Sequence, residues 1–361
     1  MAFVTHPKFD ANTEGLEVAK AFSAEIRGKT VLVTGVNRGG IGFSTSHAFA
    51  SQCPAHLIVA GRSKKKIQDS IHALKDGAPD VDFRALVVDL SSQKSVRSAA
   101  AEVLSWDNIP SIDIVVNSAG VMCIEERTLS PNGVEMHFAT NHIGHWLLTC
   151  LIMPKLIKAA KDNPKGATRV VNVTSASPMV SGIRWSDINF DKKNKDLPEA
   201  EQPNYEWFKP WGYTDLENKS YLPLDGYNRS KVANVLFGIA ANEWLYEKYG
   251  ILTLAVHPGV IETELGRNFS TEQLESIKAM IDKGIFTYKT LGAGASTSLI
   301  AALDPGLRNG VGQTLNGSEN WGSYLADCQI SNQADPRSVS SGEAEKLWAL
   351  SETLVGEAFA W

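Results

Sequence analysis

The sequence predicts an α/β fold, a doubly wound parallel sheet in a single domain, and two observations support this class. Short runs rich in Val, Ile and Leu recur along the chain, as expected of strands that are buried on both faces of a parallel sheet. Segments with helical periodicity separate these runs. Strand and helix therefore alternate, which is typical of a parallel sheet with helices on both sides.

The expected elements follow one another in a regular order. A short amphipathic stretch at residues 14–24 precedes the first strand. Strands are expected at residues 29–35, 55–62, 83–90, 112–120, 168–175 and 251–259, and helices at 64–74, 92–106, 137–160 and 227–249. A Gly-rich stretch from Asp304 and a helical pattern at 341–361 would extend the same domain. We therefore divide the chain into an N-terminal extension, residues 1–28, and one domain, residues 29–361.

One long segment, residues 176–226, lacks clear helix or strand periodicity. It is rich in aromatic residues, namely Trp185, Tyr205, Trp207, Phe208, Trp211, Tyr213 and Tyr221. Long ordered loops in compact domains tend to carry function, so we expect an inserted lid over the substrate, with Trp207 or Trp211 at its entrance. The alternative is a segment that packs its aromatic side chains on itself or on a neighbouring subunit.

Composition excludes several classes of function. The 361 residues are 43% hydrophobic and carry a formal net charge of -5, which gives no overall attraction to nucleic acid or anionic membranes. The four cysteines lie far apart, without metal-binding spacing. The first thirty residues are rich in charge, and no stretch reaches the roughly 20 apolar residues of a membrane span. We expect a cytoplasmic protein with no nucleic-acid or membrane partner.

A glycine-rich stretch, TGVNRGGIG at residues 34–42, lies between the first expected strand and the next helical pattern. At this point of an open parallel sheet, glycines allow a sharp turn and let backbone amides approach a pyrophosphate at the positive end of a helix. The stretch therefore predicts a dinucleotide site. A tight turn that binds nothing is the alternative interpretation.

Four motifs in order resemble the short-chain dehydrogenase/reductase family. They are TGVNRGGIG, NSAG at residues 117–120, YNRSK at 227–231 and HPGVIET at 257–263, and the resemblance runs from about residue 29 to the C-terminus. NGVEMHFATNHIGHWLLT and KLWALSETLVG resemble the branch with retinol dehydrogenases and fungal natural-product reductases. The chain departs from the family by one extra residue between Gly35 and Gly40, by Ser118 in place of Asn, and by a long interval between Ser175 and Tyr227. The family implies a Rossmann fold and a nicotinamide cofactor.

The expected catalytic residues are Asn141, Ser175, Tyr227 and Lys231. Tyr227 and Lys231 are four residues apart on an expected helix, where the ammonium would lower the pKa of the phenol and prepare it for proton transfer. Ser175 ends a strand and can hydrogen-bond a substrate oxygen, with Thr174 and Ser177 as nearby alternatives. The resemblance implies that Lys231 also holds the nicotinamide ribose and that Asn141 holds a relay water.

Two arginines predict the cofactor to be NADP(H). Arg62 follows the second strand, where an acidic residue would bind the 2′-hydroxyl of NAD, and Arg38 adds a second positive charge for a phosphate. Both could instead be solvated surface residues. With the family's pattern, the expected cofactor-binding residues are Gly35, Asn37, Arg38, Gly40, Ile41, Gly42, Arg62, Ser63, Asp89, Leu90, Asn117, Ala119, Gly120, Tyr227, Lys231, Pro258, Gly259, Val260 and Thr263. His142 and His145 lack a third ligand at suitable spacing, so we expect no metal.

These features predict an NADP(H)-dependent oxidoreductase. It would transfer a hydride between nicotinamide and the carbonyl or alcohol carbon of a bulky, mainly apolar small molecule, in the direction of ketone or aldehyde reduction. A sensor or scaffold that binds NADP without turnover is one alternative. Reduction of an imine or activated alkene in the same site is another. A homodimer is an open possibility.

Overall fold

The central sheet confirms the doubly wound class. The computed structural model describes residues 1–361 and contains eight strands in the order β3-β2-β1-β4-β5-β6-β7-β8. All pairs are parallel except the last, β7 with β8. The strands are β1 Thr30–Thr34, β2 His56–Gly61, β3 Asp82–Val87, β4 Ile114–Asn117, β5 Thr168–Val173, β6 Ile251–His257, β7 Tyr324–Ala326 and β8 Gln329–Ile330. Each of the six expected strands is present. Each expected range extends a few residues beyond the carboxyl end of the observed strand.

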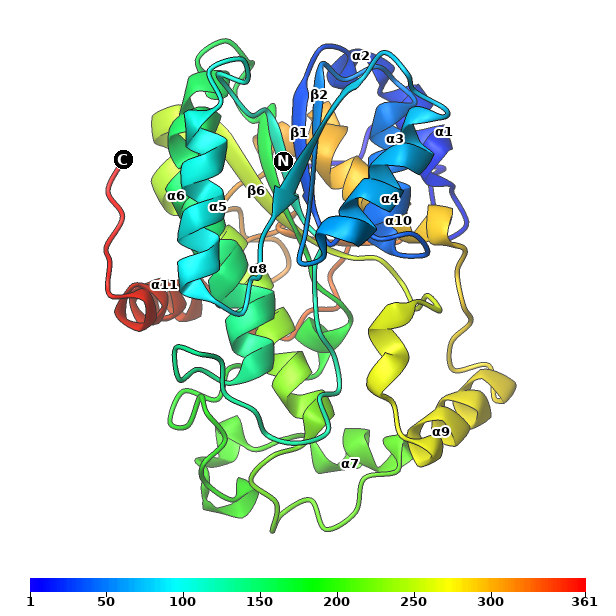
Figure 1. Cartoon of the computed structure of the whole chain (residues 1–361). Coiled ribbons are helices and arrows are strands. Elements are labelled where there is room, and N and C mark those ends of the chain that lie inside the picture. The colour runs from blue at the N-terminus through cyan, green and yellow to red at the C-terminus, as the bar shows by residue number, and fades with distance from the viewer.

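Helices cover both faces of the sheet (Figure 1). One apolar core lies under α5 (Gln93–Ser105), α6 (Gly144–Ala160), α8 (Pro223–Tyr249) and α11 (Ser341–Val355). The other lies under α1 (Gly15–Ala21), α3 (Ile41–Ala50), α4 (Lys64–Lys75) and α10 (Leu291–Leu303), with the short α2 (Ser23–Ile26) beside them. Val18 and Ala19 of α1 are fully buried, and α1 packs against α3 and α10. The N-terminal extension is therefore part of this helical layer.

The crossover of the chain creates the crevice in which ligands bind. β1 pairs with β2 on one side and with β4 on the other, so the connections run outward to β3 and then return to the opposite side. In sheets of this kind the carboxyl ends of the strands diverge at the reversal, and ligands bind there.

The helix that follows β4 begins with a wide turn. Residues Phe138–Ile143 form a π-type turn that continues into α6 at Gly144. A Cβ atom on Gly144 would lie 2.2 Å from the carbonyl oxygen of Leu90, so the helix approaches the chain after β3 more closely than other residues would permit. One helical stretch, Phe138–Asp162, is long and apolar enough to cross a membrane, but 72% of its apolar window is buried inside the protein. Burial of this kind is typical of a core helix.

The segment 176–226 folds into short turns instead of regular elements. It contains 3-10 turns at Ser177–Met179, Asn194–Asp196, Glu199–Glu201 and Lys209–Trp211, and the single-turn α7 (Tyr205–Phe208). Several of its aromatic rings contact one another: Trp207 meets Phe208 edge to face, with ring centroids 5.0 Å apart, and meets Trp211 at a tilt, with centroids 5.5 Å apart. The turn at 209–211 packs against α9 (Thr271–Asp282), below the carboxyl end of the sheet in Figure 1.

Candidate active site

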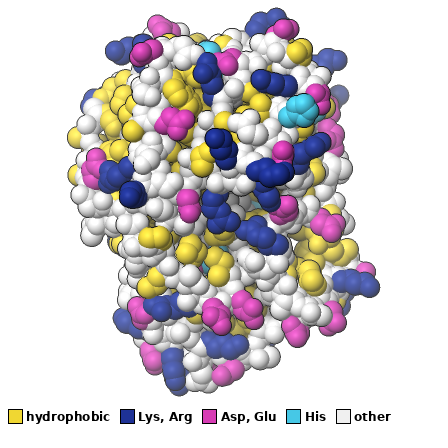
Figure 2. Space-filling model, in the orientation of Figure 1, with side chains coloured by type: hydrophobic (Ala, Val, Ile, Leu, Met, Phe, Trp, Pro, Cys, Tyr) yellow, Lys and Arg dark blue, Asp and Glu magenta, His cyan; other side chains and the backbone are white.

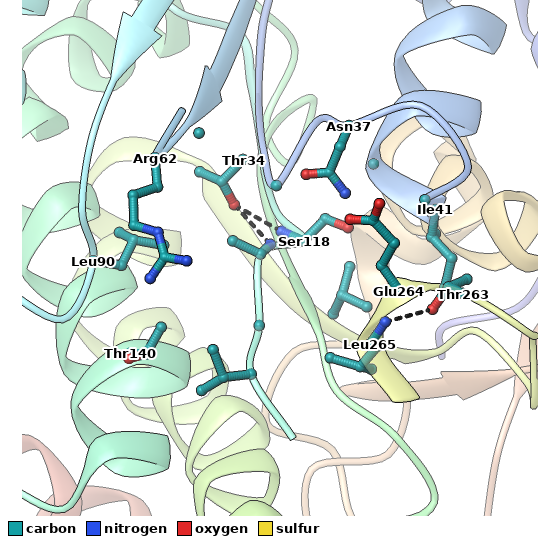
Figure 3. Close-up of a pocket in the computed structure, with 18 of the residues that line it drawn as sticks. Thr34, Asn37, Ile41, Arg62, Leu90, Ser118, Thr140, Thr263, Glu264 and Leu265 are labelled. Atoms are coloured by element: carbon teal, nitrogen blue, oxygen red, sulfur yellow. Dashed lines mark hydrogen bonds between the residues drawn. The ribbon is translucent and has the colours of Figure 1, made fainter. Parts of the chain in front are cut away.

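A cavity of about 690 Å³ opens at the carboxyl ends of the parallel strands. Its walls come from the glycine turn after β1, the ends of β2 to β6, the start of α8, and the segment after β6 that includes the 3-10 turn η6 (Glu264–Asn268). Figure 3 shows Arg62 extending from the end of β2 toward the cavity, opposite Glu264. The sheet thus places chain segments that are far apart in the sequence around one space.

The glycine turn needs its glycines for close packing. Gly35 has a φ of +73°, and a Cβ atom there would lie 2.6 Å from the Cα of Ala119. The extra residue of this turn is absorbed by a tight bend in which the amide of Gly40 donates to the carbonyl of Asn37, at 3.0 Å, with Gly39 at a φ of +80°. This bend turns Arg38 into solvent, and Arg38 does not line the cavity. Its expected contact with a 2′-phosphate stays a prediction.

The helix behind this turn suits a pyrophosphate. No side chain caps the N-terminus of α3, whose first residues, Ile41 and Gly42, line the cavity. Uncapped amides at a helix N-terminus favour an anion. The glycine cradle and these amides fit the diphosphate of a nicotinamide dinucleotide.

The adenosine end of the cavity carries positive side chains. Arg62, Ser63, Asp89 and Leu90 all line it, as expected. No acidic side chain follows β2 at the position of Arg62. Lys66, in the first turn of α4, also lines the cavity, and its ammonium lies 2.8 Å from the carboxylate of Glu264.

The catalytic end brings three predicted residues together. Ser175, Tyr227 and Lys231 line the same cavity, and Ser175 lies close enough to Tyr227 to favour its phenolate form. The Nζ atom of Lys231 lies 5.7 Å from the centre of the Tyr227 ring and donates to the carbonyl of Val173, at 2.8 Å. α8 supplies both side chains because it begins four residues before Tyr227, at Pro223, a residue suited to the first turn of a helix.

Burial controls the protonation of this pair. Burial raises the pKa of Tyr227, although its hydrogen bond to Ser175 acts in the opposite direction. Burial lowers the pKa of Lys231 to about 7. The expectation that the Lys231 ammonium lowers the tyrosine pKa is thus not met in the protein alone, because desolvation of the phenolate outweighs the attraction. At neutral pH the phenol keeps its proton.

Asn141 lies behind the cavity and does not line it. Its side chain accepts from the amide of Val121 at 2.8 Å and donates to the Val121 carbonyl at 2.9 Å and to Ser230 Oγ at 2.9 Å. A Cβ atom on Gly120 would lie 3.4 Å from Asn141 Oδ1 and 3.6 Å from Lys231 Nζ. Asn141 therefore holds the loop after β4 beside the lysine, and its role in a water relay stays a prediction.

The two histidines near Asn141 are hydrogen-bonded within the core. His145 contacts the carbonyl of Asn141 through Nδ1 and Thr34 Oγ1 through Nε2, both at 2.9 Å, and His142 contacts Ser351 Oγ at 2.8 Å. Burial lowers the pKa of His145 to about 4 and that of His142 to about 3. Both imidazoles are neutral at physiological pH.

Some of the predicted site residues lie outside the lining of the cavity. Besides Arg38 and Asn141, neither Asn117 nor Val260 lines the cavity. The Asn117 amide donates to Thr149 and Asn172 inside the sheet, whereas Ile261 faces the space next to Val260. Lining residues that were missed include Lys66, Glu264, Arg267 and Asn268. Lys66 lies in the first turn of α4, close after Arg62 in the sequence, and the run of lysines there could have revealed it, but no pattern marks the other three.

The expected lid does not cover this cavity. No residue from 176–226 lines it. Phe208, only 1% exposed, instead packs in an apolar cluster with Cys123, Leu222 and Tyr227. Trp207, Phe208 and Trp211 contact one another, and the turn at 209–211 packs against α9, so this part of the segment packs beside Tyr227.

Comparisons with known proteins agree with this geometry. A family model described as short chain dehydrogenase matches residues 29–187. The chain is 38% identical to oxidoreductase fscI of Fusarium equiseti over 251 residues, which cover 70% of this chain and 94% of the relative. It is 31% identical to retinol dehydrogenase 14 of Mus musculus, with 92% and 87% covered. A solved short-chain type dehydrogenase/reductase from Mycobacterium marinum has the same fold, with a TM-score of 0.57, 17% identity, and 86% and 97% of the two chains covered.

Proposed function

The chain belongs to the short-chain dehydrogenase/reductase family, and from this premise we propose that it reduces ketones or aldehydes with NADPH. Membership of the family means oxidoreduction with a nicotinamide cofactor. The observation that supports reduction is the convergence of Ser175, Tyr227 and Lys231 on one end of a cavity whose other end fits a dinucleotide. A sensor without turnover would not need this set.

When bound, the nicotinamide would supply or accept the hydride. Tyr227 would give its phenolic proton to the carbonyl oxygen of the substrate, because burial keeps that proton in place at neutral pH. Ser175 would donate a hydrogen bond to the same oxygen and stabilise the charge that develops there. Lys231 would hold the ribose hydroxyls and, in its charged form, favour the phenolate that remains.

The preference for NADP over NAD rests on the side chains after β2. Arg62 lines the cavity where an acidic residue would select the 2′-hydroxyl of NAD, and Lys66 lies beside it. Figure 2 shows Lys and Arg side chains gathered over the region of α4, where Arg62, Lys64, Lys65 and Lys66 are exposed. This local positive charge would attract a 2′-phosphate although the net charge of the chain is negative.

A bulky, mainly apolar substrate is proposed from the walls near Tyr227. The apolar residues Val121 and Leu265 line the same cavity as Tyr227, and Arg267 and Asn268 follow Leu265 along this wall. The name of the relative retinol dehydrogenase 14 points to a large apolar alcohol for that protein. We extend only the general class, an apolar carbonyl compound or alcohol, to this chain.

The experiment that tests this function is a screen of NADPH oxidation against apolar ketones and aldehydes of increasing size, with NADH in parallel. We expect turnover with NADPH and higher kcat/KM for larger apolar carbonyls than for acetaldehyde. Tight binding of NADPH without oxidation by any carbonyl compound would instead support a sensor.

A further inference from the structure

Three side chains form a hydrogen-bonded line that leads from the catalytic serine into the core. The hydroxyl oxygens of Ser175 and Ser177 are 2.6 Å apart, and Ser177 Oγ lies 2.8 Å from the side-chain amide of Asn228. The backbone amide of Ser177 also donates to Ser175 Oγ, at 3.0 Å. Ser177 and Asn228 are 4% and 2% exposed, so water does not compete for these contacts.

The orientation of the Asn228 amide decides which way the protons of this line point. A serine hydroxyl has one proton to donate and two lone pairs that accept. If Asn228 turns its oxygen to Ser177, then Ser177 must donate to Asn228, and Ser175 must donate to Ser177. The proton of Ser175 is then turned away from the substrate. If Asn228 turns its NH₂ group to Ser177, then Ser177 keeps its own proton and can donate it to Ser175, which leaves the proton of Ser175 for an oxygen in the cavity.

Unpaired polar atoms favour the second orientation. With its oxygen toward Ser177, Asn228 has a buried NH₂ group without any hydrogen-bond partner. A rotation of 180° about the terminal bond exchanges the two groups and gives that NH₂ group an acceptor in Ser177 Oγ. The carbonyl oxygen is left unpaired instead, and a buried N–H without a partner is rarer and more costly than an under-satisfied carbonyl.

We propose that Asn228 and Ser177 are positioning residues that direct the proton of Ser175 into the active site. Asn228 donates to Ser177, and Ser177 donates to Ser175. The two lone pairs of Ser175 are then occupied by the hydroxyl and the amide of Ser177. Its own proton points to the oxygen of Tyr227 in the resting protein and to the carbonyl oxygen of the bound substrate. This inference rests on the proposed reductase function.

The test uses a carboxylate that can only accept. In Asn228→Asp, the ionised side chain would force Ser177 to donate to it and would turn the proton of Ser175 away from the substrate. We expect kcat to fall about 10- to 100-fold at pH 8, as when a donor to a developing oxyanion is lost. Protonation of the introduced carboxyl restores a donor, so the ratio of variant to parent kcat should rise as the pH falls.

The ratio of variant to parent kcat isolates the effect of the carboxyl group introduced at residue 228. The charged side chains of α8 near Asn228 are Asp225, Arg229 and Lys231, and Arg337 lies on the 3-10 turn at Pro336–Val339 that packs against α8. They are the same in both proteins, so their titration cancels in the ratio to first order. If Asn228 had only a structural role, the loss of kcat in Asn228→Asp would not be reversed when the pH is lowered.

Two further variants test whether Asn228 acts on Ser175 through the hydroxyl of Ser177. Ser177→Ala removes the hydroxyl that links Asn228 to Ser175. It introduces no acceptor that competes for the proton of Ser175, so we expect only a few-fold loss of kcat. In the double variant, Asn228→Asp should add little to that loss. The matched control is Asn242→Asp, a buried asparagine of α8 whose amide pairs with both backbone groups of Thr253. It should lower the melting temperature and leave kcat near that of the parent.

The outcomes separate the two proposals. A folded Asn228→Asp variant with kcat within twofold of the parent from pH 5.5 to 8 overturns the orientation proposal, as does a full additional loss in the double variant. If Asn228→Asp does not fold, an unchanged kcat in Ser177→Ala overturns it. Absence of NADPH oxidation by the parent protein would overturn the reductase function itself.

Discussion

The side chains of Tyr227 and Lys231 have each lost almost all contact with water, at 7% and 3% exposure. For the tyrosine, burial disfavours the charged phenolate and so keeps the proton that a reductase must donate. For the lysine, burial lowers the pKa to about 7, so its charge changes near physiological pH. The type and spacing of these two residues marked them as candidates in the sequence, but their protonation depends on desolvation that only the fold reveals.

The buried lysine makes a prediction about stability. Its pKa is about 7 in the folded protein and near 10.4 in the unfolded chain, so between these values the unfolded state binds more protons. The free energy of unfolding should therefore rise with pH across this window, and the contribution of Lys231 is on the order of a few kcal/mol. Lys231→Met should flatten the rise, as measured by urea unfolding at pH 7 and pH 9.5. A slope equal to that of the parent would show that Lys231 is not desolvated in solution.

Arg62 makes a prediction about cofactor choice. Arg62→Asp should weaken NADPH binding by about tenfold or more and leave NADH binding unchanged or tighter, because a carboxylate repels the 2′-phosphate and accepts from a 2′-hydroxyl. Fluorescence titration with both cofactors measures this. Arg38→Asp is the matched control, since Arg38 faces solvent, and it should change the preference much less. Equal affinities of the parent for the two cofactors would contradict the assignment.

Two elements meet across the mouth of the cavity. Lys66 on α4 and Glu264 on η6 form an ion pair in which both side chains are about half exposed, at 55% and 53%. The carboxylate lines the same space as the glycine turn, where we expect a pyrophosphate. Entry of the cofactor therefore requires this pair to separate or to shift, and the pair itself contributes little to stability.

Neutralising that carboxylate should favour the cofactor. Glu264→Gln should tighten NADPH binding several-fold, because it removes a negative charge near the phosphates and leaves Lys66 unpaired. The gain should shrink at 0.5 M salt, since exposed charges are screened. Isothermal titration at low and high salt measures both effects, with Glu262→Gln, outside the cavity lining, as the control. Weaker binding of NADPH by Glu264→Gln would mean that Glu264 positions a cofactor-binding group.

The whole molecule is held together by segments at both ends of the chain. α1 packs on α3 and α10. The amide of Phe3 donates to the carbonyl of Gly306, and the amide and hydroxyl of Thr5 both donate to the carboxylate of Asp304. α11 packs along α8, which holds Tyr227. Residues 1–28 therefore pack as part of the same domain.

Removal of residues 1–28 tests this integration. The truncation would expose apolar side chains of α3 and α10 that α1 now covers, including Leu299, which is fully buried. We expect the free energy of unfolding to fall by several kcal/mol, because fully burying one aliphatic side chain stabilises by about 1.5–3 kcal/mol. Thermal unfolding with and without NADPH measures this. An unchanged melting temperature would show that the segment is an independent extension.

The sequence predicted the order of the buried strands well, because continuous apolar runs and the motifs at their ends depend on local pattern. It could not predict β7 and β8, which are two to three residues long and gain their place from pairing with β6. Nor could it predict the direction of the Arg38 side chain, which depends on the bend at Gly39, where φ is +80°. The location of the aromatic segment behind Tyr227, and not over the cavity, follows from packing against α9, which no local pattern encodes.

The account depends most directly on Tyr227 as the proton donor to a carbonyl. The decisive measurement is NADPH oxidation by Tyr227→Phe against the best carbonyl substrate of the parent, with NADPH affinity measured on the same preparation. We predict that kcat falls by about a thousandfold while the dissociation constant of NADPH stays within about twofold, because only the transferable proton is removed. A variant that keeps more than about a tenth of the parent kcat would contradict the role of Tyr227 and the proposed mechanism with it.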